Sequence, residues 1–208
     1  MSDTLYLAPE PDEDGLGLSR FISLLGIELK HRSTFSPAPG APLDHAWSVW
    51  QETLFLPHFA PAFVQAFNAT STLQIDEAVK ADLKIDAALP AAIRQSSLLA
   101  GRPFLEGKSE MRGHREWIRF AERVEQGQSP GHVCVLFAAQ SALYHLPLPA
   151  AVSAFACFEF QARHATFPFK EMPEDEKQVF STILKLIPLA VKDKSTENDA
   201  GDGTLHAI

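Results

Sequence analysis

The sequence predicts an all-α protein, a single multi-helix domain of about eight helices. Apolar side chains recur at helical spacing along most of the chain, and almost no segment alternates apolar and polar residues as a strand does. Proline and glycine fall mainly between the periodic stretches. A chain of 208 residues suits one domain with a sizeable core. We expect the helical domain to cover residues 15–192.

The segments on either side of that domain, residues 1–14 and 193–208, are polar and acidic. The net charge of the whole chain is −8, and the first segment alone carries five acidic residues and no basic one. Both segments are expected to be flexible because they offer little apolar surface to bury. The remaining domain is nearly neutral, so its charge gives no reason to expect nucleic acid as a partner.

The sequence predicts three helices in the first half of the domain. The first covers residues 16–32 and is followed by a loop rich in proline. Asp44 can cap the second helix, and Pro57 is expected to end it. Pro61 suits the first turn of the third helix.

The next helices are predicted from shorter signals. Residues 75–83 form a weaker helical stretch, and Pro90 opens a helix that Gly101 can close. Residues 114–126 form the most regular amphipathic pattern of the chain.

Two segments are apolar on nearly every side and are therefore expected to be central. They cover residues 132–145 and 149–166. A last helix is predicted over residues 173–191, interrupted at Pro188.

The sequence gives no sign of export or of a membrane span. No apolar run approaches the roughly 20 residues that a membrane helix needs. The first residues lack the basic and apolar regions of a signal peptide. Cys134 and Cys157 lie within apolar helical patterns, where buried free thiols are expected instead of a disulfide or a zinc site. A cytoplasmic location is therefore expected.

No motif in the sequence predicts catalysis. There is no nucleophile elbow, phosphate loop or dinucleotide fingerprint. The eight histidines include no His-x-x-x-His pair, and only Glu28 and His31 have the Glu-x-x-His spacing of carboxylate-bridged metal sites. We expect no catalytic residue, no metal ligand and no cofactor.

Arginine residues are the clearest candidates for contacts with a partner. Arg115, Arg119 and Arg123 fall on the side of one predicted helix opposite its apolar face, and Arg112 joins them if the helix begins early enough. Such a stripe can bind carboxylates or phosphates through paired hydrogen bonds. The alternative is a solvated face that nearby glutamates neutralise.

Two further patterns have both a structural and a functional interpretation. Glu159 and Arg163 are four residues apart in an apolar helix, where they can form a buried pair or present the arginine to a partner. Arg94, Ser97 and Gly101 lie on one helix face, where small residues allow another backbone to approach closely or simply pack.

The order of these features resembles that of UreF proteins. Residues 86–102 carry an acid, an arginine, a serine and a glycine at the spacing of a UreF helix. A Gly-His step then opens an apolar helix, and a later helix ends in an arginine. The resemblance covers roughly residues 50–190. The positions it picks out are Arg94, Ser97, Gly101, Gly131, His132 and Arg163.

The resemblance implies a non-catalytic chaperone of nickel-dependent urease maturation. Such a protein bridges a scaffold accessory protein and a nickel-carrying GTPase, acts on the urease apoprotein and can form a homodimer. Some of the six positions would then serve folding instead of contact. Neither nucleic acid nor a membrane is expected as a partner.

Two alternatives remain open at the level of sequence. The histidine count allows a helical metalloenzyme with a histidine-lined pocket. UreF proteins also carry a glycine pair in the loop after the first helix, whereas residues 33–42 here have none. That difference allows a helical regulatory binding module that has changed its partner.

Overall fold

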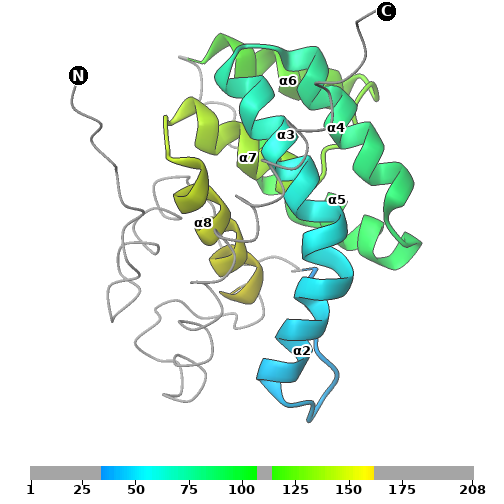
Figure 1. The fold of residues 1–208 in the computed structure, drawn as a ribbon. Helices are drawn as coiled ribbons and strands as arrows, with labels where there is room; N and C mark the ends of the chain where they lie inside the picture. The colour runs from blue at the N-terminus through cyan, green and yellow to red at the C-terminus, as the bar shows by residue number, and fades with distance from the viewer. Residues whose placement is uncertain (1–33, 107–113, 162–208) are drawn as a thin grey trace, which may run out of the picture.

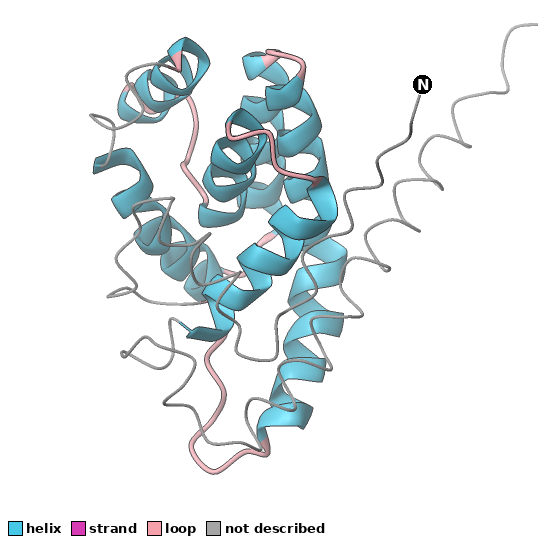
Figure 2. Cartoon of the chain, turned by 90° about the vertical axis from the view of Figure 1, so that its left-hand side faces the viewer, coloured by secondary structure: helices cyan, strands magenta, loops and turns pink. Residues whose placement is uncertain are grey.

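The computed structural model describes residues 34–106 and 114–161, and within these ranges the chain is helical without a strand. This confirms the predicted all-α class. The helices form a bundle, drawn in Figure 1 and, from the side, in Figure 2. In chain order the elements are α2 (Leu43–Trp50), the π-helical segment η1 (Gln51–Phe59), α3 (Ala60–Ser71), α4 (Ile75–Ala88), α5 (Ala91–Glu106), α6 (Arg115–Glu125), α7 (Val133–Leu143) and α8 (Leu148–Gln161).

Several predictions fall outside the described residues. They are the two acidic end segments, the helices over residues 16–32 and 173–191, and the positions of Arg112 and Arg163. The boundaries of the helical domain likewise stay predictions.

The prediction that Pro57 ends a helix is wrong. The chain stays helical from α2 through η1 to the end of α3, and Pro57 lies inside η1. A proline in an α-helix removes one hydrogen bond and clashes with the carbonyl four residues earlier. Because a π-helical turn is wider and joins residues five apart, it accommodates the ring without ending the helix.

Two predicted helix starts have different outcomes. Asp44 does not cap α2: the helix begins at Leu43, Asp44 lies in its first turn, and no side-chain capping bond forms. A carboxylate there still interacts favourably with the positive end of the helix dipole. Pro61 does lie in the first turn of α3, as predicted.

The end predicted for α5 is also wrong. The helix begins just after Pro90, as expected, but continues through Gly101 to Glu106 with Pro103 inside it. Gly101 is therefore an interior residue and not a cap. Its role lies in the packing of α5 against α7, described below.

Helix α7 is the centre of the bundle, as its apolar pattern predicts. Every residue from Val133 to Leu143 is buried. The helix packs against α3, α4, α5, α6 and α8, and Figure 1 shows it between α8 and the green helices α4 and α5. The rings of Phe63, Phe137 and Phe155, from three different helices, meet around it. Cys134 is a buried free thiol, as expected.

Glu159 of α8 holds the segment that leads into α2. Its fully buried carboxylate accepts hydrogen bonds from the backbone N–H of Thr34 (2.7 Å), the hydroxyl of Thr34 (2.9 Å) and the backbone N–H of Phe35 (3.3 Å). The indole N–H of Trp50 also donates to the Thr34 hydroxyl. The first residues of the segment without the glycine pair are thus fixed to the core by a carboxylate.

Helix α6 agrees closely with its predicted amphipathic pattern. Trp117, Phe120 and Ala121 are buried on one side, whereas Arg119 and Arg123 are exposed on the other. No helix within residues 34–106 and 114–161 is both long and apolar enough to cross a membrane.

Candidate functional site

A buried carboxylate of α4 holds the first turn of α7. Asp82 accepts hydrogen bonds from the hydroxyl of Ser129 (2.6 Å), the backbone N–H of Gly131 (2.6 Å) and the backbone N–H of His132 (2.9 Å). The side chain of His132, the N-cap residue, forms no capping bond itself. Asp82 therefore acts as the cap of α7 from another helix, at the end where the helix dipole favours an anion.

Burial and hydrogen bonding have opposite effects on the pKa of Asp82. The residue is fully buried, and burial raises the pKa of its carboxyl above the ordinary value of 3.8. The hydrogen bonds from Ser129, Gly131 and His132 act in the opposite direction, because they stabilise the ionised form. Burial has the larger effect on the pKa.

The ring of His132 joins α7 to α4 and α5. Its Nδ1 lies 3.0 Å from Oγ of Ser97, and its Nε2 lies 3.1 Å from Oδ1 of Asp86. An ionised carboxylate only accepts hydrogen bonds, so Nε2 carries a proton and donates to Asp86. In the neutral ring Nδ1 then accepts from the Ser97 hydroxyl. Both His132 and Ser97 are fully buried.

Asp86 continues this chain of contacts to the surface. Its Oδ1 also lies 3.6 Å from Nε of Arg94, and Nη2 of Arg94 donates to the carbonyl of Leu89 at 3.2 Å. The Arg94 and Asp86 side chains are 39% and 32% exposed, against 0% for His132. We call Asp82, Asp86, Arg94, Ser97, Ser129 and His132 the polar cluster.

Two glycines let α5 approach the start of α7. A Cβ on Gly101 would overlap the carbonyl oxygen of Gly131 and press on Leu136 and the backbone of Val133. Gly131 has a φ of +87°, a conformation that side chains rarely adopt, and a Cβ there would meet Val124. The polar cluster can therefore form only because both positions lack a side chain.

The structure brings together most of the positions that the resemblance picks out. Ser97, Gly101, Gly131 and His132 lie in or beside the polar cluster and are buried, whereas Arg94 lies at its exposed edge. The four buried positions hold helices together here. Their predicted role in partner contact stays a prediction.

Sequence reasoning missed Asp82 and Ser129. Asp82 precedes Asp86 by four residues, so both carboxylates lie on one face of α4, and Asp82 stands among the buried Ala78, Ala81 and Ile85. An acid among buried apolar positions indicates a carboxylate with buried donors to satisfy. That signal was present in the sequence.

The α6 arginines form a separate, exposed site. Arg119 pairs with Glu116 at 3.3 Å. Arg123 pairs with Asp76 at 3.3 Å and donates to the side-chain oxygen of Gln128 at 2.7 Å. Arg115 is exposed, and no ion pair links it to the described part of the chain. The stripe is thus partly neutralised by acids of α4 and α6.

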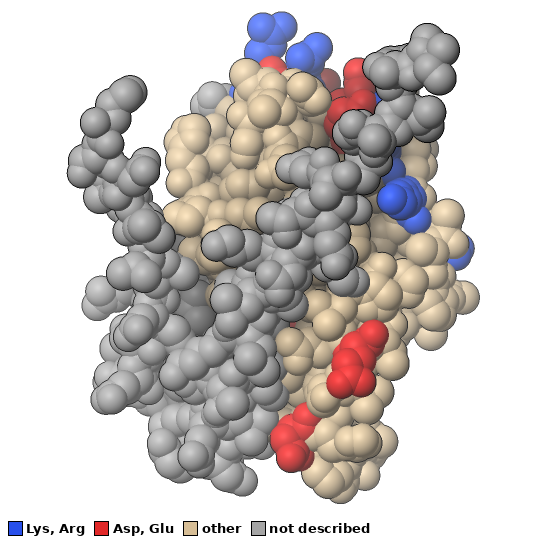
Figure 3. Space-filling model, viewed as in Figure 1, with Lys and Arg blue, Asp and Glu red and all other residues tan. Residues whose placement is uncertain are grey.

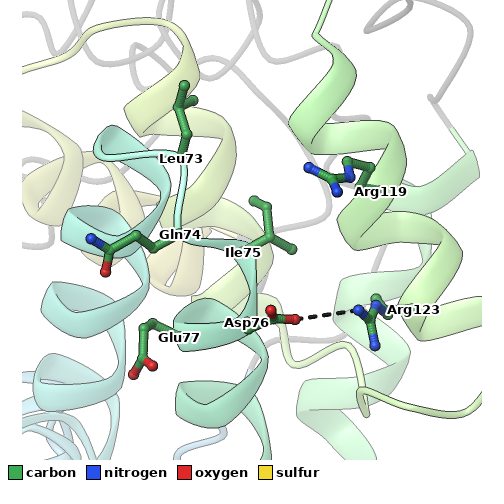
Figure 4. A pocket seen from close by; sticks show the side chains of 7 residues that line it. All are labelled: Leu73, Gln74, Ile75, Asp76, Glu77, Arg119 and Arg123. Atoms are coloured by element: carbon green, nitrogen blue, oxygen red, sulfur yellow. Dashed lines mark hydrogen bonds and ion pairs between the residues drawn. The ribbon is translucent and has the colours of Figure 1, made fainter.

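Arg119 and Arg123 line a pocket between α6 and the start of α4. Its volume is about 320 Å³, and Figure 4 shows the two arginines across from Ile75 and Asp76. Leu73, in the turn before α4, is exposed and has a φ of +60°. Figure 3 shows Lys and Arg at the top of the molecule near α6 and at the right near α4 and α5.

The described residues contain no group of three or more His, Cys, Asp or Glu side chains that could hold a metal ion. Glu28 and His31, which motivate the metalloenzyme alternative, lie outside the described residues.

The fold and the polar cluster define an all-helical protein whose central helix is capped by a buried carboxylate of a neighbouring helix. The UreF family model matches residues 46–158, more than half of the chain and nearly all of its described helices. The chain therefore belongs to the UreF family, the urease accessory proteins of that name. Comparison with curated proteins gives no match, and comparison with solved structures gives none either.

Proposed function

We propose that this urease accessory protein is a non-catalytic, cytoplasmic chaperone that bridges a scaffold accessory protein and a nickel-carrying GTPase while the urease apoprotein receives nickel. The observation that carries the proposal is the UreF family match over residues 46–158. The matched region contains the whole polar cluster, so the residues that resemble the family also build the centre of this fold.

The predicted site residues differ in burial, and we infer that they differ in role. Ser97, Gly101, Gly131 and His132 are buried and set the relative positions of α4, α5 and α7. Arg94 is half-buried with a side chain that is 39% exposed, the α6 arginines are exposed, and these are the positions that a partner can reach. Arginine is enriched where protein interfaces have their largest contributions to binding, because its planar group forms several hydrogen bonds at once.

The partners themselves provide the test. The purified chain is mixed with the scaffold accessory protein and the GTPase of the same organism, and the mass of the complexes is measured by analytical ultracentrifugation. We expect a complex of all three proteins, and no association of the scaffold with the GTPase when the chain is left out. A chain that binds neither protein would overturn the proposed function.

A further inference from the structure

Arg94 is held in place by contacts that lead back into the core. Asp86 lies against its Nε, and the carbonyl of Leu89 accepts from its Nη2. Asp86 is in turn fixed by the ring of His132, which is fully buried and bonded to Ser97. An arginine on the surface normally samples many rotamers, so these contacts restrict a side chain that would otherwise be mobile.

The same contacts leave part of the guanidinium unused. Nη1 of Arg94 and the second N–H of Nη2 have no acceptor among the described residues. Two parallel N–H groups are what a bidentate bond to one carboxylate needs. The side chain is 39% exposed, so these groups can be reached from solvent.

An exposed leucine lies beside Asp86. Leu83 is 49% exposed and precedes Asp86 by three residues on α4, so the two are neighbours on the helix surface. A large aliphatic side chain at the edge of a polar contact can exclude water from that contact and so strengthen it.

We propose that Arg94 is a pre-oriented contact for a carboxylate on a urease accessory partner, with Asp86 and His132 as positioning residues. The inference rests on the proposed function, and it adds the chemistry of the partner's contact and the residues that prepare for it. Leu83 supplies the apolar side of the same surface.

The neighbouring charge favours a carboxylate over a phosphate. Asp86 places a negative charge 3.6 Å from Nε of Arg94. That charge opposes any second anion, and it opposes a phosphate more than a carboxylate, because a phosphate group carries more negative charge.

Four variants separate contact from positioning. Arg94→Ala removes the contact, and Arg94→Lys keeps the charge but not the planar fork. Asp86→Asn removes the charge that orients Arg94 while keeping nearly the same shape. Arg102→Ala is the matched control, because Arg102 is an exposed arginine of the same helix. Circular dichroism and thermal melting confirm that each variant is folded.

Binding to the scaffold accessory protein and to the GTPase is measured separately by calorimetry. We expect Arg94→Ala to weaken the affinity for one of them at least about tenfold, a common effect for a central interface arginine. Arg94→Lys should recover only part of that loss, Asp86→Asn should weaken binding by less than Arg94→Ala, and Arg102→Ala should bind like the wild type.

An NMR measurement on the chain alone tests the positioning. In the wild type, ¹⁵N relaxation should show restricted motion of the Arg94 guanidinium because Asp86 forms an ion pair with it, and Asp86→Asn should make the guanidinium more mobile. A guanidinium that is equally mobile in both proteins would overturn the role of Asp86.

The outcomes of the two experiments are distinguishable. A wild-type chain that binds neither partner would remove the proposed function and this inference together. Wild-type binding that Arg94→Ala leaves unchanged would overturn only the inference and leave the proposed function intact.

Discussion

Gly101 of α5 packs directly on Gly131 at the start of α7, backbone against backbone. A Cβ on Gly101 would overlap the Gly131 carbonyl oxygen, and the two helices would have to move apart. Because that carbonyl belongs to the turn whose N–H groups Asp82 binds, the contact also sets the geometry of the polar cluster.

This contact predicts whether replacing Gly101 by alanine raises or lowers the stability of the protein. In an exposed helix, Gly→Ala is stabilising by up to about 1 kcal/mol. We expect Gly101→Ala to destabilise the protein instead, by about 1–2 kcal/mol, because overpacking of a tight core costs roughly 1–3 kcal/mol and outweighs the gain in helix propensity. Denaturant unfolding measures the difference.

Gly127→Ala serves as its comparison. Gly127 has a φ of +71° but open space around it, so the loss of stability in Gly127→Ala is limited to backbone strain of about 1–2 kcal/mol. A Gly101→Ala variant more stable than the wild type would show that α5 and α7 do not touch in this way.

Removal of the Asp82 carboxylate should cost more than any surface change. Asp82→Ala leaves the Ser129 hydroxyl and the N–H groups of Gly131 and His132 buried without their acceptor. Each such group costs about 1–3 kcal/mol, so we expect a loss of about 3 kcal/mol or more in the free energy of unfolding. A loss below about 1 kcal/mol would contradict the capping role of Asp82.

The raised pKa of Asp82 predicts how stability depends on pH. In the folded state burial raises the pKa above 3.8, so between 3.8 and the folded value the folded chain holds a proton that the unfolded chain has lost. The contribution of this proton to stability is fully present below 3.8 and is lost as the pH rises through the folded pKa.

Asp82→Asn isolates that contribution, because asparagine does not titrate. We expect the unfolding free energy of the wild type, relative to that of Asp82→Asn, to fall as the pH rises from about 3.8. Urea unfolding at a series of acidic pH values measures it. A relative stability that instead increases with pH would show that the hydrogen bonds outweigh burial and lower the pKa.

The α6 arginines should matter for binding and little for folding. Arg123 and Asp76 are 46% and 80% exposed, and exposed ion pairs contribute only about 0–1 kcal/mol. We expect the double variant Arg119→Ala/Arg123→Ala to lose less than about 1 kcal/mol of stability.

The same double variant should bind the scaffold accessory protein or the GTPase at least about tenfold more weakly. Arg102→Ala is again the control for the loss of a positive charge. Unchanged affinity for both partners would assign the arginine stripe to a solvated face, the other interpretation of its pattern.

The sequence predicts the helices whose patterns depend on burial alone. Helix α7 is apolar on every side and is central, and α6 separates its tryptophan from its arginines and lies at the surface. In both helices, the arrangement that the local pattern favours is also the one that packing requires. Hydrophobic periodicity alone is therefore sufficient to predict where each helix lies.

The predictions are wrong where tertiary packing, and not the local sequence pattern, decides the structural role of a residue. Pro57 and Gly101 are typical helix-ending residues, yet a π-helical turn accommodates the first and a neighbouring backbone requires the second. The sequence places Asp82 among apolar positions of α4, but the donors that it binds lie nearly fifty residues further along the chain. Such a pairing depends on how α4 meets α7, which no local pattern contains.

Nickel in urease itself gives the most direct test of the accessory role. Urease is purified from the organism with this gene deleted and from the same strain complemented with the gene, and the nickel bound per active site is measured by mass spectrometry of the metal. The proposed function predicts urease that is nearly free of nickel in the deletion strain and fully loaded after complementation. Fully loaded, active urease in the deletion strain would contradict it.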